Sequence, residues 1–271
     1  MDRRTLLAAG AAALLPPVPS ARRLDKIGVQ LYTVRNEMKR DVDATLARVA
    51  EIGFQEVEFA GYFNKNPDDL RRTLARLGLT APGAHYSFEE MRDGWDRTLD
   101  AASRVGHRWA IVAWIPGEER TTLDGWRRVA EWFNHAGEQT RAAGLRFAYH
   151  NHSYEFTPVE GRIPFDVLLA ETDPAVVEIE MDLYWITKGG QDPRVYFARH
   201  PGRFPLVHVK DAGPAPDFQM VDVGRGAIDW KGIFAMSRQA GMRHVFVEHD
   251  EPDDAFASIA TGLQYLKRLR F

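Results

Sequence analysis

The sequence contains no cysteine, which excludes disulfide bonds and thiolate metal ligands. Any metal must therefore be held by His, Asp and Glu side chains, a donor set that suits manganese, zinc, cobalt or iron. The chain also lacks an excess of one charge, because 35 Lys and Arg residues stand against 38 Asp and Glu residues and the formal net charge is -3. Without a broad basic field we expect no nucleic-acid partner.

Long apolar runs are missing from the body of the chain, and the one near the N-terminus is too short for an ordinary membrane span. There Arg3 and Arg4 precede a leucine- and alanine-rich stretch, and prolines follow it. This pattern is typical of an export signal, and the paired arginines indicate the twin-arginine route for folded proteins. We predict a signal segment over residues 1–21, a periplasmic protein, and no stable membrane association after processing. A disordered or membrane-anchoring tail is the alternative.

From residue 26 onward, short apolar, β-branched runs alternate with stretches of helical periodicity. The predicted strands are residues 27–32, 56–59, 81–85, 109–113, 146–150, 177–182, 206–209 and 245–248. The predicted helices lie near residues 42–52, 67–77, 88–105, 121–143, 164–171, 193–200, 229–240 and 253–269. Glycines such as Gly53 and Gly106 directly follow several of these helices and mark their ends. The alternation predicts an α/β fold, a single-domain (β/α)8 TIM barrel over residues 22–271.

Polar side chains recur at the carboxyl ends of the predicted strands, where barrel enzymes place their active sites. In chain order they are Gln30, Tyr32, Glu58, His85, Trp114, His150, His152, Glu155, Asp182, Trp185, His208, Lys210 and Glu248. Because side chains alternate across a strand, His150 and His152 share a face, as do His208 and Lys210. If that face is the barrel interior, imidazoles and carboxylates converge, and a divalent metal is the simplest counter-ion for the carboxylates.

Each of these residues taken alone has a simpler explanation. A lone His at a strand end, such as His85, is more often a hydrogen-bonded structural residue than a ligand. Glu58 could be a salt-bridge partner, and Asp182 is explained equally well as the N-cap of the next helix. Glu178 and Glu180 fit least well, because they share the face of Asp182 and would lie deeper in the barrel, where the sequence offers no reason for two carboxylates. The recurrence of ligand-type residues at several strand ends is what favours a functional site.

Six segments together carry a resemblance to a known family: GVQLYTVR, YHNHSYEF, EMDLYW, LVHVKD, DVGRGAIDW and VEHD. With them, residues 26–271 resemble the xylose isomerase-like TIM barrels described as sugar phosphate isomerases/epimerases, in a subgroup that contains YHNH. Members of that family typically hold one metal with an acidic residue of strand five, an Asp of strand six, a His of strand seven and a Glu of strand eight. By position, the resemblance implies Asp182, His208 and Glu248 as ligands, with His150 in place of the usual Glu.

The resemblance implies an isomerase or epimerase that moves a proton next to the carbonyl of a sugar or keto-sugar, with one divalent metal ion as cofactor. The predicted metal ligands are His150, Asp182, His208 and Glu248. The predicted catalytic residues are Glu248, Glu155 and His152. The predicted substrate-binding residues are Gln30, Tyr32, Glu58, His85, Trp114, Trp185, Lys210 and Arg225.

Three questions stay open in the sequence. A lyase or dehydratase acting on a keto-sugar or polyol would share the same intermediate as an epimerase. A non-catalytic protein that binds a small-molecule sugar is a second alternative, and it would tolerate the loss of Glu248. Either His150 or His152 is the ligand from strand five; we predict His150, with His152 and Glu155 near the metal but not bound to it.

Overall fold

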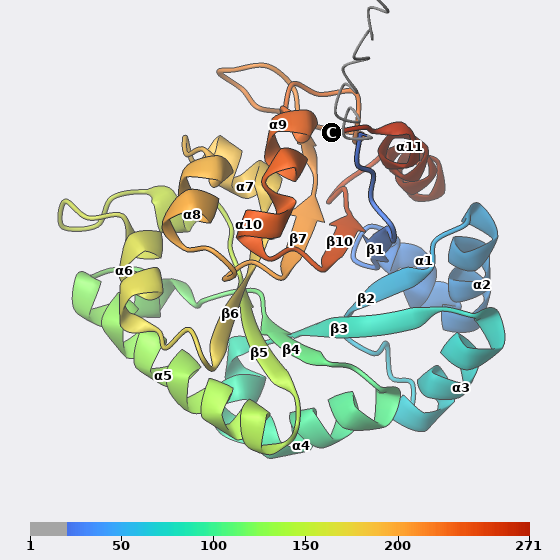
Figure 1. Ribbon diagram of the computed structural model, residues 1–271. Helices are drawn as coiled ribbons and strands as arrows, with labels where there is room; N and C mark the ends of the chain where they lie inside the picture. The colour runs from blue at the N-terminus through green and yellow to red at the C-terminus, as the bar shows by residue number, and fades with distance from the viewer. Residues whose placement is uncertain (1–20) are drawn as a thin grey trace, which may run out of the picture.

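The computed structural model describes residues 21–271, which form a closed barrel of parallel strands (Figure 1). The strands are β1 (Gly28–Gln30), β2 (Glu56–Ala60), β3 (Thr80–Tyr86), β4 (Trp109–Val112), β5 (Arg146–His150), β6 (Val177–Asp182), β7 (Leu206–Val209) and β10 (His244–Val247). β1 pairs with both β2 and β10, which closes the barrel. The predicted (β/α)8 barrel is confirmed, whereas the predicted signal segment lies, but for its last residue, outside the described part of the chain.

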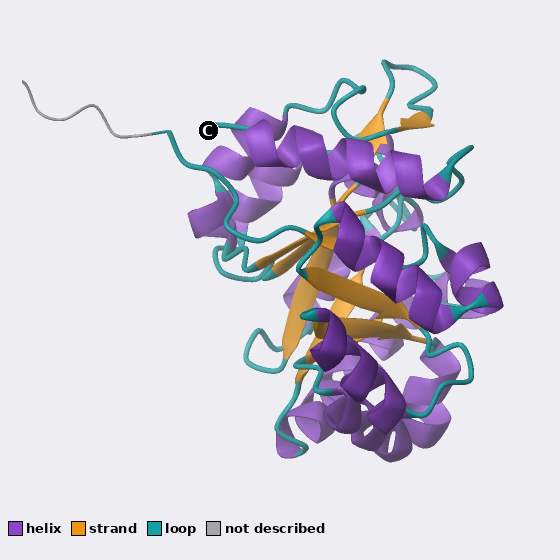
Figure 2. Ribbon diagram, turned by 90° about the vertical axis from the view of Figure 1, so that its right-hand side faces the viewer, coloured by secondary structure: helices purple, strands orange, loops and turns teal. Residues whose placement is uncertain are grey.

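The helices surround the strands on the outside of the barrel (Figure 2). They are α2 (Val42–Ile52), α3 (Pro67–Leu77), α4 (Phe88–Val105), α5 (Leu123–Ala142), α6 (Pro164–Glu171), α8 (Pro193–Arg199), α9 (Trp230–Ala235), α10 (Ser237–Ala240) and α11 (Ala255–Arg268). Their positions agree with the predicted helical stretches. Gly53 and Gly106 end α2 and α4 in the left-handed conformation, with φ of 105° and 101°, as expected of glycines at helix C-termini.

Several short elements were not predicted. They are α1 (Arg35–Arg40), α7 (Leu183–Lys188), the 3-10 helices η1 (Gly117–Arg120) and η2 (Tyr154–Phe156), and a small hairpin of β8 (Asp211–Ala212) and β9 (Met220–Val221). Each lies in a connection that follows the carboxyl end of a barrel strand. None is long enough to show a hydrophobic period in the sequence. These elements build the rim of the barrel mouth.

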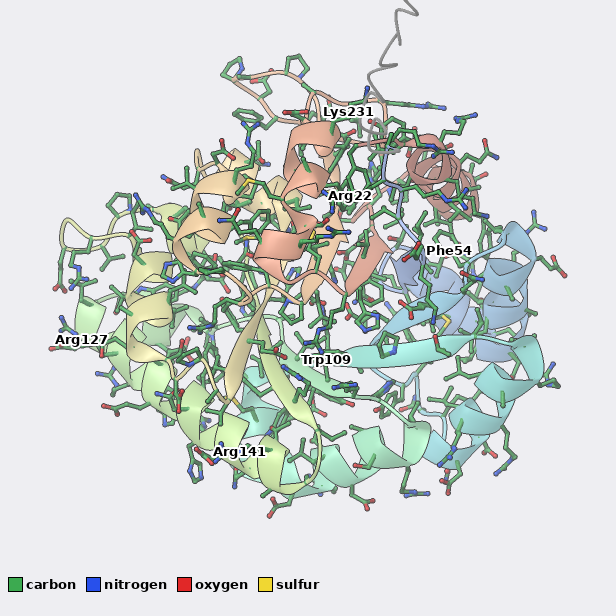
Figure 3. The ribbon with its side chains drawn as sticks, viewed as in Figure 1. Arg22, Phe54, Trp109, Arg127, Arg141 and Lys231 are labelled. Carbon is green, nitrogen blue, oxygen red and sulfur yellow. The ribbon has the colours of Figure 1, made fainter. Side chains whose placement is uncertain are left out.

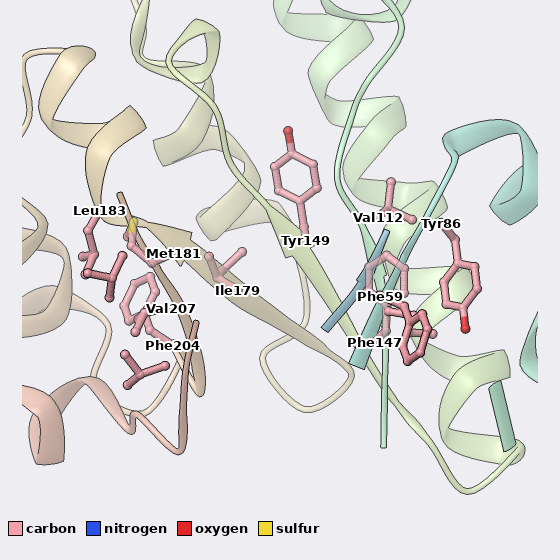
Figure 4. Close-up of a cluster of buried hydrophobic side chains, with 14 of the residues drawn as sticks. Phe59, Tyr86, Val112, Phe147, Tyr149, Ile179, Met181, Leu183, Phe204 and Val207 are labelled. Atoms are coloured by element: carbon pink, nitrogen blue, oxygen red, sulfur yellow. The ribbon is translucent and has the colours of Figure 1, made fainter. Parts of the chain in front are cut away.

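Apolar side chains pack in two places. The larger core lies between the strands and the helices and includes Phe59, Phe147, Tyr149 and Val207 (Figure 4). A smaller cluster fills the inside of the barrel, and we call it the inner plug: Trp109, Ile111, Ala148, Leu206 and Phe246. Trp109 lies near the middle of the barrel in Figure 3. The plug closes the barrel interior, so polar groups at the carboxyl ends rest on an apolar base.

No helix within residues 21–271 is both long enough and apolar enough to cross a membrane.

Candidate active site

The polar strand ends enclose a cavity of about 330 Å³ at the mouth of the barrel. It is lined by Tyr32, His85, Ala113, Trp114, His150, His152, Lys210, Glu248 and Asp250. All but Ala113 and Asp250 belong to the set predicted from the sequence. The expectation that these residues converge is therefore correct, although the lining does not include all of the predicted residues.

Lys210 is buried at the centre of the carboxylates of this cavity. Its Nζ lies 3.2 Å from Asp182 Oδ2, 3.0 Å from Glu248 Oε2 and 2.9 Å from Asp250 Oδ1. Burial acts to lower the pKa of Lys210, but Asp182 and Glu248 outweigh it and raise the pKa well above its usual value. Burial acts to raise the pKa of Glu248, but Lys210 and His208 hold it well below its usual value. At neutral pH the cavity therefore contains an ammonium group beside an ionised carboxylate.

A second layer of polar side chains lies beneath the cavity lining. His208 contacts a carboxylate through each ring nitrogen, with Nδ1 2.6 Å from Glu248 Oε2 and Nε2 2.6 Å from Glu58 Oε2. Gln30 donates a hydrogen bond of 2.7 Å from Nε2 to the same Glu58 oxygen. Gln30 and Glu58 are fully buried and do not line the cavity, so the substrate-binding role predicted for them lacks support from their position.

Glu180 is the main residue of the site that the sequence argument did not identify. Its Oε2 lies 2.6 Å from His85 Nε2, 3.2 Å from His150 Nδ1 and 3.3 Å from His208 Nε2. Burial raises the pKa of Glu180, but the positive charges of His208 and His85 outweigh it and lower the pKa well below its usual value. The pairing of β5 with β6 sets Glu180 opposite His150 in the folded barrel.

Glu178, the other unexplained carboxylate, serves the barrel structure. Its Oε2 accepts hydrogen bonds of 2.7 Å from Trp109 Nε1 and 2.7 Å from Arg146 Nε, and the Arg146 guanidinium also forms an ion pair with its other oxygen. Arg146 shares the strand face of Ala148 and His150, so an arginine at an inward position was the sequence signal for this carboxylate partner.

The histidines of the site differ in charge. Burial, reinforced by His208 and His85, lowers the pKa of His150 well below its usual value. Burial together with Lys210 lowers the pKa of His152 to about 3. For His85, burial is outweighed by Glu58 and Glu180, which raise the pKa to about 9. His150 and His152 are therefore neutral at physiological pH, and neutral imidazole is the form that binds a metal or accepts a proton.

The donor groups fit a divalent metal ion. Two sets of side chains bring one donor atom each into a common space: Asp182, His208 and Glu248 in one, and His85, His150, Glu180 and His208 in the other. Asp182 Oδ2 is buried without a hydrogen bond among the described residues, and it lies 3.2 Å from the ammonium nitrogen of Lys210 and 3.7 Å from His150 Nε2. A buried carboxylate oxygen beside neutral imidazole and a second carboxylate suits zinc, manganese, iron or cobalt. The predicted ligands draw on both sets, and their assignment stays a prediction.

Two predicted residues lie away from the cavity. Glu155 is fully buried behind β5, where Oε1 accepts hydrogen bonds of 2.5 Å from Tyr149 Oη and 2.8 Å from the His152 backbone N–H. Burial raises its pKa to about 7. Arg225 lies beyond β9 with its side chain 67% exposed, 3.5 Å from Asp222 Oδ2. Glu155 supports the segment that carries His152, and the structure does not bring Arg225 to the lining.

Aromatic rings form the outer part of the cavity. Trp114 is 49% exposed and Tyr32 is 41% exposed. The Trp114 and His152 rings are nearly perpendicular, with 5.3 Å between their centroids, and the centroid of the Trp185 ring lies 5.6 Å from that of His152. These rings offer flat apolar surfaces next to the charged groups, an arrangement suited to a small molecule with both polar and apolar faces.

Comparison with known proteins gives a consistent result. A family model described as the xylose isomerase-like TIM barrel matches residues 46–269. Among curated proteins, an inosose dehydratase of Geobacillus thermodenitrificans is 24% identical over 249 residues, which cover 79% of this chain and 83% of the relative.

Solved structures agree on the fold. A sugar phosphate isomerase/epimerase from Parabacteroides distasonis is 27% identical and superposes with a TM-score of 0.79, covering 90% of this chain and 98% of the other. The IolI protein with a bound zinc atom is 14% identical, with a TM-score of 0.71 over 89% of this chain and 96% of the other. At that identity the likeness to IolI concerns the fold alone.

Proposed function

The chain belongs to the xylose isomerase-like TIM barrel family, and from this premise we propose that it is a metal-dependent lyase that removes water from a keto-sugar or a related cyclic polyol ketone. Its relatives are sugar-modifying enzymes, an inosose dehydratase and a sugar phosphate isomerase/epimerase among them. The chain is accordingly an enzyme with isomerase, epimerase or lyase-type chemistry, and a non-catalytic sugar-binding role is set aside.

The observation that carries the proposal is the pairing of one neutral imidazole with one ammonium group in the same cavity. His152 lines the cavity with a neutral ring whose Nδ1 has no hydrogen-bond partner among the described residues, so it is placed to take the proton next to the substrate carbonyl. Its low pKa makes it a weak base, and polarisation of the carbonyl by the metal ion would acidify that C–H to match it. Lys210 keeps its proton and can donate a hydrogen bond to an oxygen on which negative charge develops or to a departing hydroxyl. A base and a separate acid are the two groups that an elimination of water requires.

The metal ion of the proposal would be held by His150, Asp182, His208 and Glu248. Such an ion supplies Lewis-acid polarisation of the substrate carbonyl. The low pKa of His150 keeps its ring in the neutral form that such a site needs. The IolI relative binds zinc in a barrel of the same fold, which supports a metal here without fixing its identity.

The cavity suits a single ring-sized substrate. Its volume, about 330 Å³, is at the small end of the range for ligand sites. Tyr32 and Trp114 in the lining supply apolar faces for the C–H side of a sugar ring. Lys210, His152 and Asp250 supply polar groups for its hydroxyls.

Epimerisation is the second candidate, favoured by the position of Glu248. In the barrel, β10 and β5 are separated by β7 and β6, so Glu248 and His152 reach the cavity from different sides. Two bases on opposite faces of a substrate are what an epimerase needs. Against this, Glu248 lies 3.0 Å from Lys210 Nζ and 2.6 Å from His208 Nδ1, and both contacts weaken it as a base.

The test is incubation of the metal-loaded protein with inososes and keto-sugars in heavy water. A dehydratase yields a product lighter by one water that absorbs as a conjugated ketone, whereas an epimerase yields deuterium incorporation without loss of water. His152→Gln should lower kcat by roughly 10² to 10⁴ in either case, because it removes the base. His135→Gln, a change of the same kind on the exposed face of α5, is the control and should leave kcat unchanged. Unchanged kcat in His152→Gln would refute the assigned base.

A further inference from the structure

We propose that Glu58 is a positioning residue that acts through His208: by accepting a hydrogen bond at Nε2, it leaves Nδ1 as the nitrogen available to the metal ion. Gln30 holds Glu58 in place. This inference rests on the proposed function, because it takes His208 to be a metal ligand. It also gives Gln30 and Glu58 a role different from the substrate binding that their position at strand ends suggested.

The geometry around Glu58 leaves little freedom. The residue is fully buried, and its Oε2 lies 2.6 Å from His208 Nε2, 2.7 Å from Gln30 Nε2 and 3.1 Å from His85 Nε2. The orientation of Gln30 is fixed in turn, because its Oε1 accepts a hydrogen bond of 3.0 Å from the Tyr32 backbone N–H. The amide group must therefore direct its NH₂ at Glu58.

The consequence for His208 follows from the chemistry of imidazole. A neutral ring carries one proton, and only the nitrogen without it can bind a metal. Both ring nitrogens of His208 face a carboxylate at 2.6 Å, Glu58 at Nε2 and Glu248 at Nδ1, so without a metal ion the ring can hold both protons. A metal ion held by Asp182 and Glu248 would replace the proton on Nδ1, because that nitrogen lies on the side of the predicted ligands, and Glu58 would keep the proton on Nε2. A carboxylate behind a metal-binding histidine also makes the ring a stronger ligand.

His85 and Glu180 complete a closed arrangement with Glu58 and His208, which we call the inner ring. His85 Nε2 lies 3.1 Å from Glu58 Oε2 and 2.6 Å from Glu180 Oε2. Glu180 Oε2 in turn lies 3.3 Å from His208 Nε2. Carboxylate and imidazole alternate, so each charged or polar group faces a group of the opposite kind.

The rival explanation is that the inner ring itself binds a second metal ion. Glu58 Oε1 and Glu180 Oε1 are buried without hydrogen-bond partners among the described residues, and a second ion would use them. If His208 took part in both sites, it would bind one ion through each nitrogen and lose both ring protons. A bound proton on Nε2 needs no such step, so a single ion above the ring is favoured.

The experiment compares Glu58→Gln with the matched control Glu178→Gln. Glu178 is also a buried glutamate of the barrel interior, but it contacts Trp109 and Arg146 and not the histidines. Metal content by elemental analysis, the dissociation constant from chelator competition, and the visible spectrum of the cobalt-substituted protein are measured for each. We expect one ion per chain in the wild type. Glu58→Gln should still bind one ion with a dissociation constant raised roughly 10- to 100-fold and an altered cobalt spectrum, while the control matches the wild type.

A fourth measurement reads the proton itself. In the zinc-loaded protein labelled with ¹⁵N-histidine, His208 should show a protonated Nε2 in a strong hydrogen bond, and Glu58→Gln should weaken that signal. None of these four measurements depends on turnover. Should Glu58→Gln fail to fold, Gln30→Met removes only the support of Glu58 and should raise the dissociation constant in the same direction by a smaller factor.

The outcomes separate this inference from the proposed function. A wild type that binds no divalent ion contradicts the proposed function. If the wild type binds one ion and Asp182→Ala releases it, but Glu58→Gln and Gln30→Met keep the wild-type dissociation constant and cobalt spectrum, the inference alone is wrong. Two ions per wild-type chain and one in Glu58→Gln would make Glu58 a ligand and overturn the inference.

Discussion

Asp182 uses its two carboxylate oxygens for different tasks. Oδ1 accepts hydrogen bonds of 2.9 Å from the Tyr184 N–H and 2.8 Å from the Trp185 N–H, which makes Asp182 the N-cap of α7. Oδ2 faces Lys210 and His150 at the cavity. The two explanations offered by the sequence, helix cap and metal ligand, are therefore compatible in one side chain. The cap also fixes the direction of the free oxygen.

This division of tasks leads to a prediction for two substitutions. Asp182→Ala removes both oxygens, so it should abolish metal binding and destabilise the protein through the lost ion pair with Lys210, and by a further ~1 kcal/mol through the lost cap. Asp182→Ser keeps an oxygen that can cap α7 but does not reach the cavity, so it should abolish metal binding with a smaller loss of stability. Urea unfolding of the metal-free proteins and metal analysis check the pair. Metal binding retained by both variants would remove Asp182 from the ligand set.

At the residue scale, the sequence indicates what reaches the cavity better than what lies beneath it. His150 and His208 could be predicted because each ends a strand and alternation fixes its face. Glu180 could not, because its partner His85 is 95 residues away in the chain and only the closed barrel brings them together. Glu155 is close to His152 in space as well as in sequence, but η2 turns the chain so that its side chain points behind β5, toward Tyr149, and its catalytic role stays a prediction.

Among the elements, α5 lies unusually close to the chain that enters β6. A Cβ at Gly137 of α5 would lie 2.6 Å from the backbone oxygen of Val176, closer than side chains tolerate, whereas a Cβ at Gly117 of η1 would meet nothing within 4 Å. A glycine in the middle of a helix is otherwise unfavourable, so Gly137 is explained by this close approach.

The contact predicts opposite results for two glycine-to-alanine changes. Gly137→Ala should lower the free energy of unfolding by about 1 to 3 kcal/mol, because α5 must move away from the backbone at Val176. Gly117→Ala should change it by less than about 0.5 kcal/mol. Denaturant unfolding of both variants measures the difference. If Gly137→Ala proved as stable as the wild type, α5 would have room to shift, and the close approach would not constrain the glycine.

The longer helices and all barrel strands could be predicted from the sequence, because N-cap residues, glycines at helix ends and hydrophobic runs all indicate the same elements. The short rim elements depend on tertiary hydrogen bonds that leave no period in the sequence. In the segment DVGRGAIDW, the backbone N–H groups of Gly224 and Gly226 bond Asp211 Oδ2, at 2.8 and 3.1 Å, and Trp230 Nε1 bonds the same oxygen at 3.1 Å. Asp211 thus shapes the connection after β7, and the motif is a structural part of the mouth.

For the whole molecule, stability and chemistry occupy opposite ends of one barrel. The inner plug and the Glu178–Arg146 pair lie toward the amino ends of the strands, and the ionisable groups of the cavity lie at the carboxyl ends. The barrel closes between β1 and β10, and among the described residues the core begins at Ile27. The segment before β1 is bound to the C-terminus of the chain, because Arg22 and Phe271 exchange backbone hydrogen bonds of 2.7 and 3.0 Å.

From the paired arginines and the apolar stretch that follows them we predict that residues 1–21 serve export and not folding. A chain that begins at Arg22 should unfold at the same midpoint as the full chain and bind metal with the same affinity. A chain that begins at Lys26 loses the contact between Arg22 and Phe271 and should unfold at a lower temperature.

In the native host, Arg3→Lys combined with Arg4→Lys should keep the protein in the cytoplasm, because the twin-arginine route requires the arginine pair. Cell fractionation and mass spectrometry of the mature N-terminus test this. A periplasmic double variant would contradict the route, and an intact Met1 on all of the protein would contradict processing.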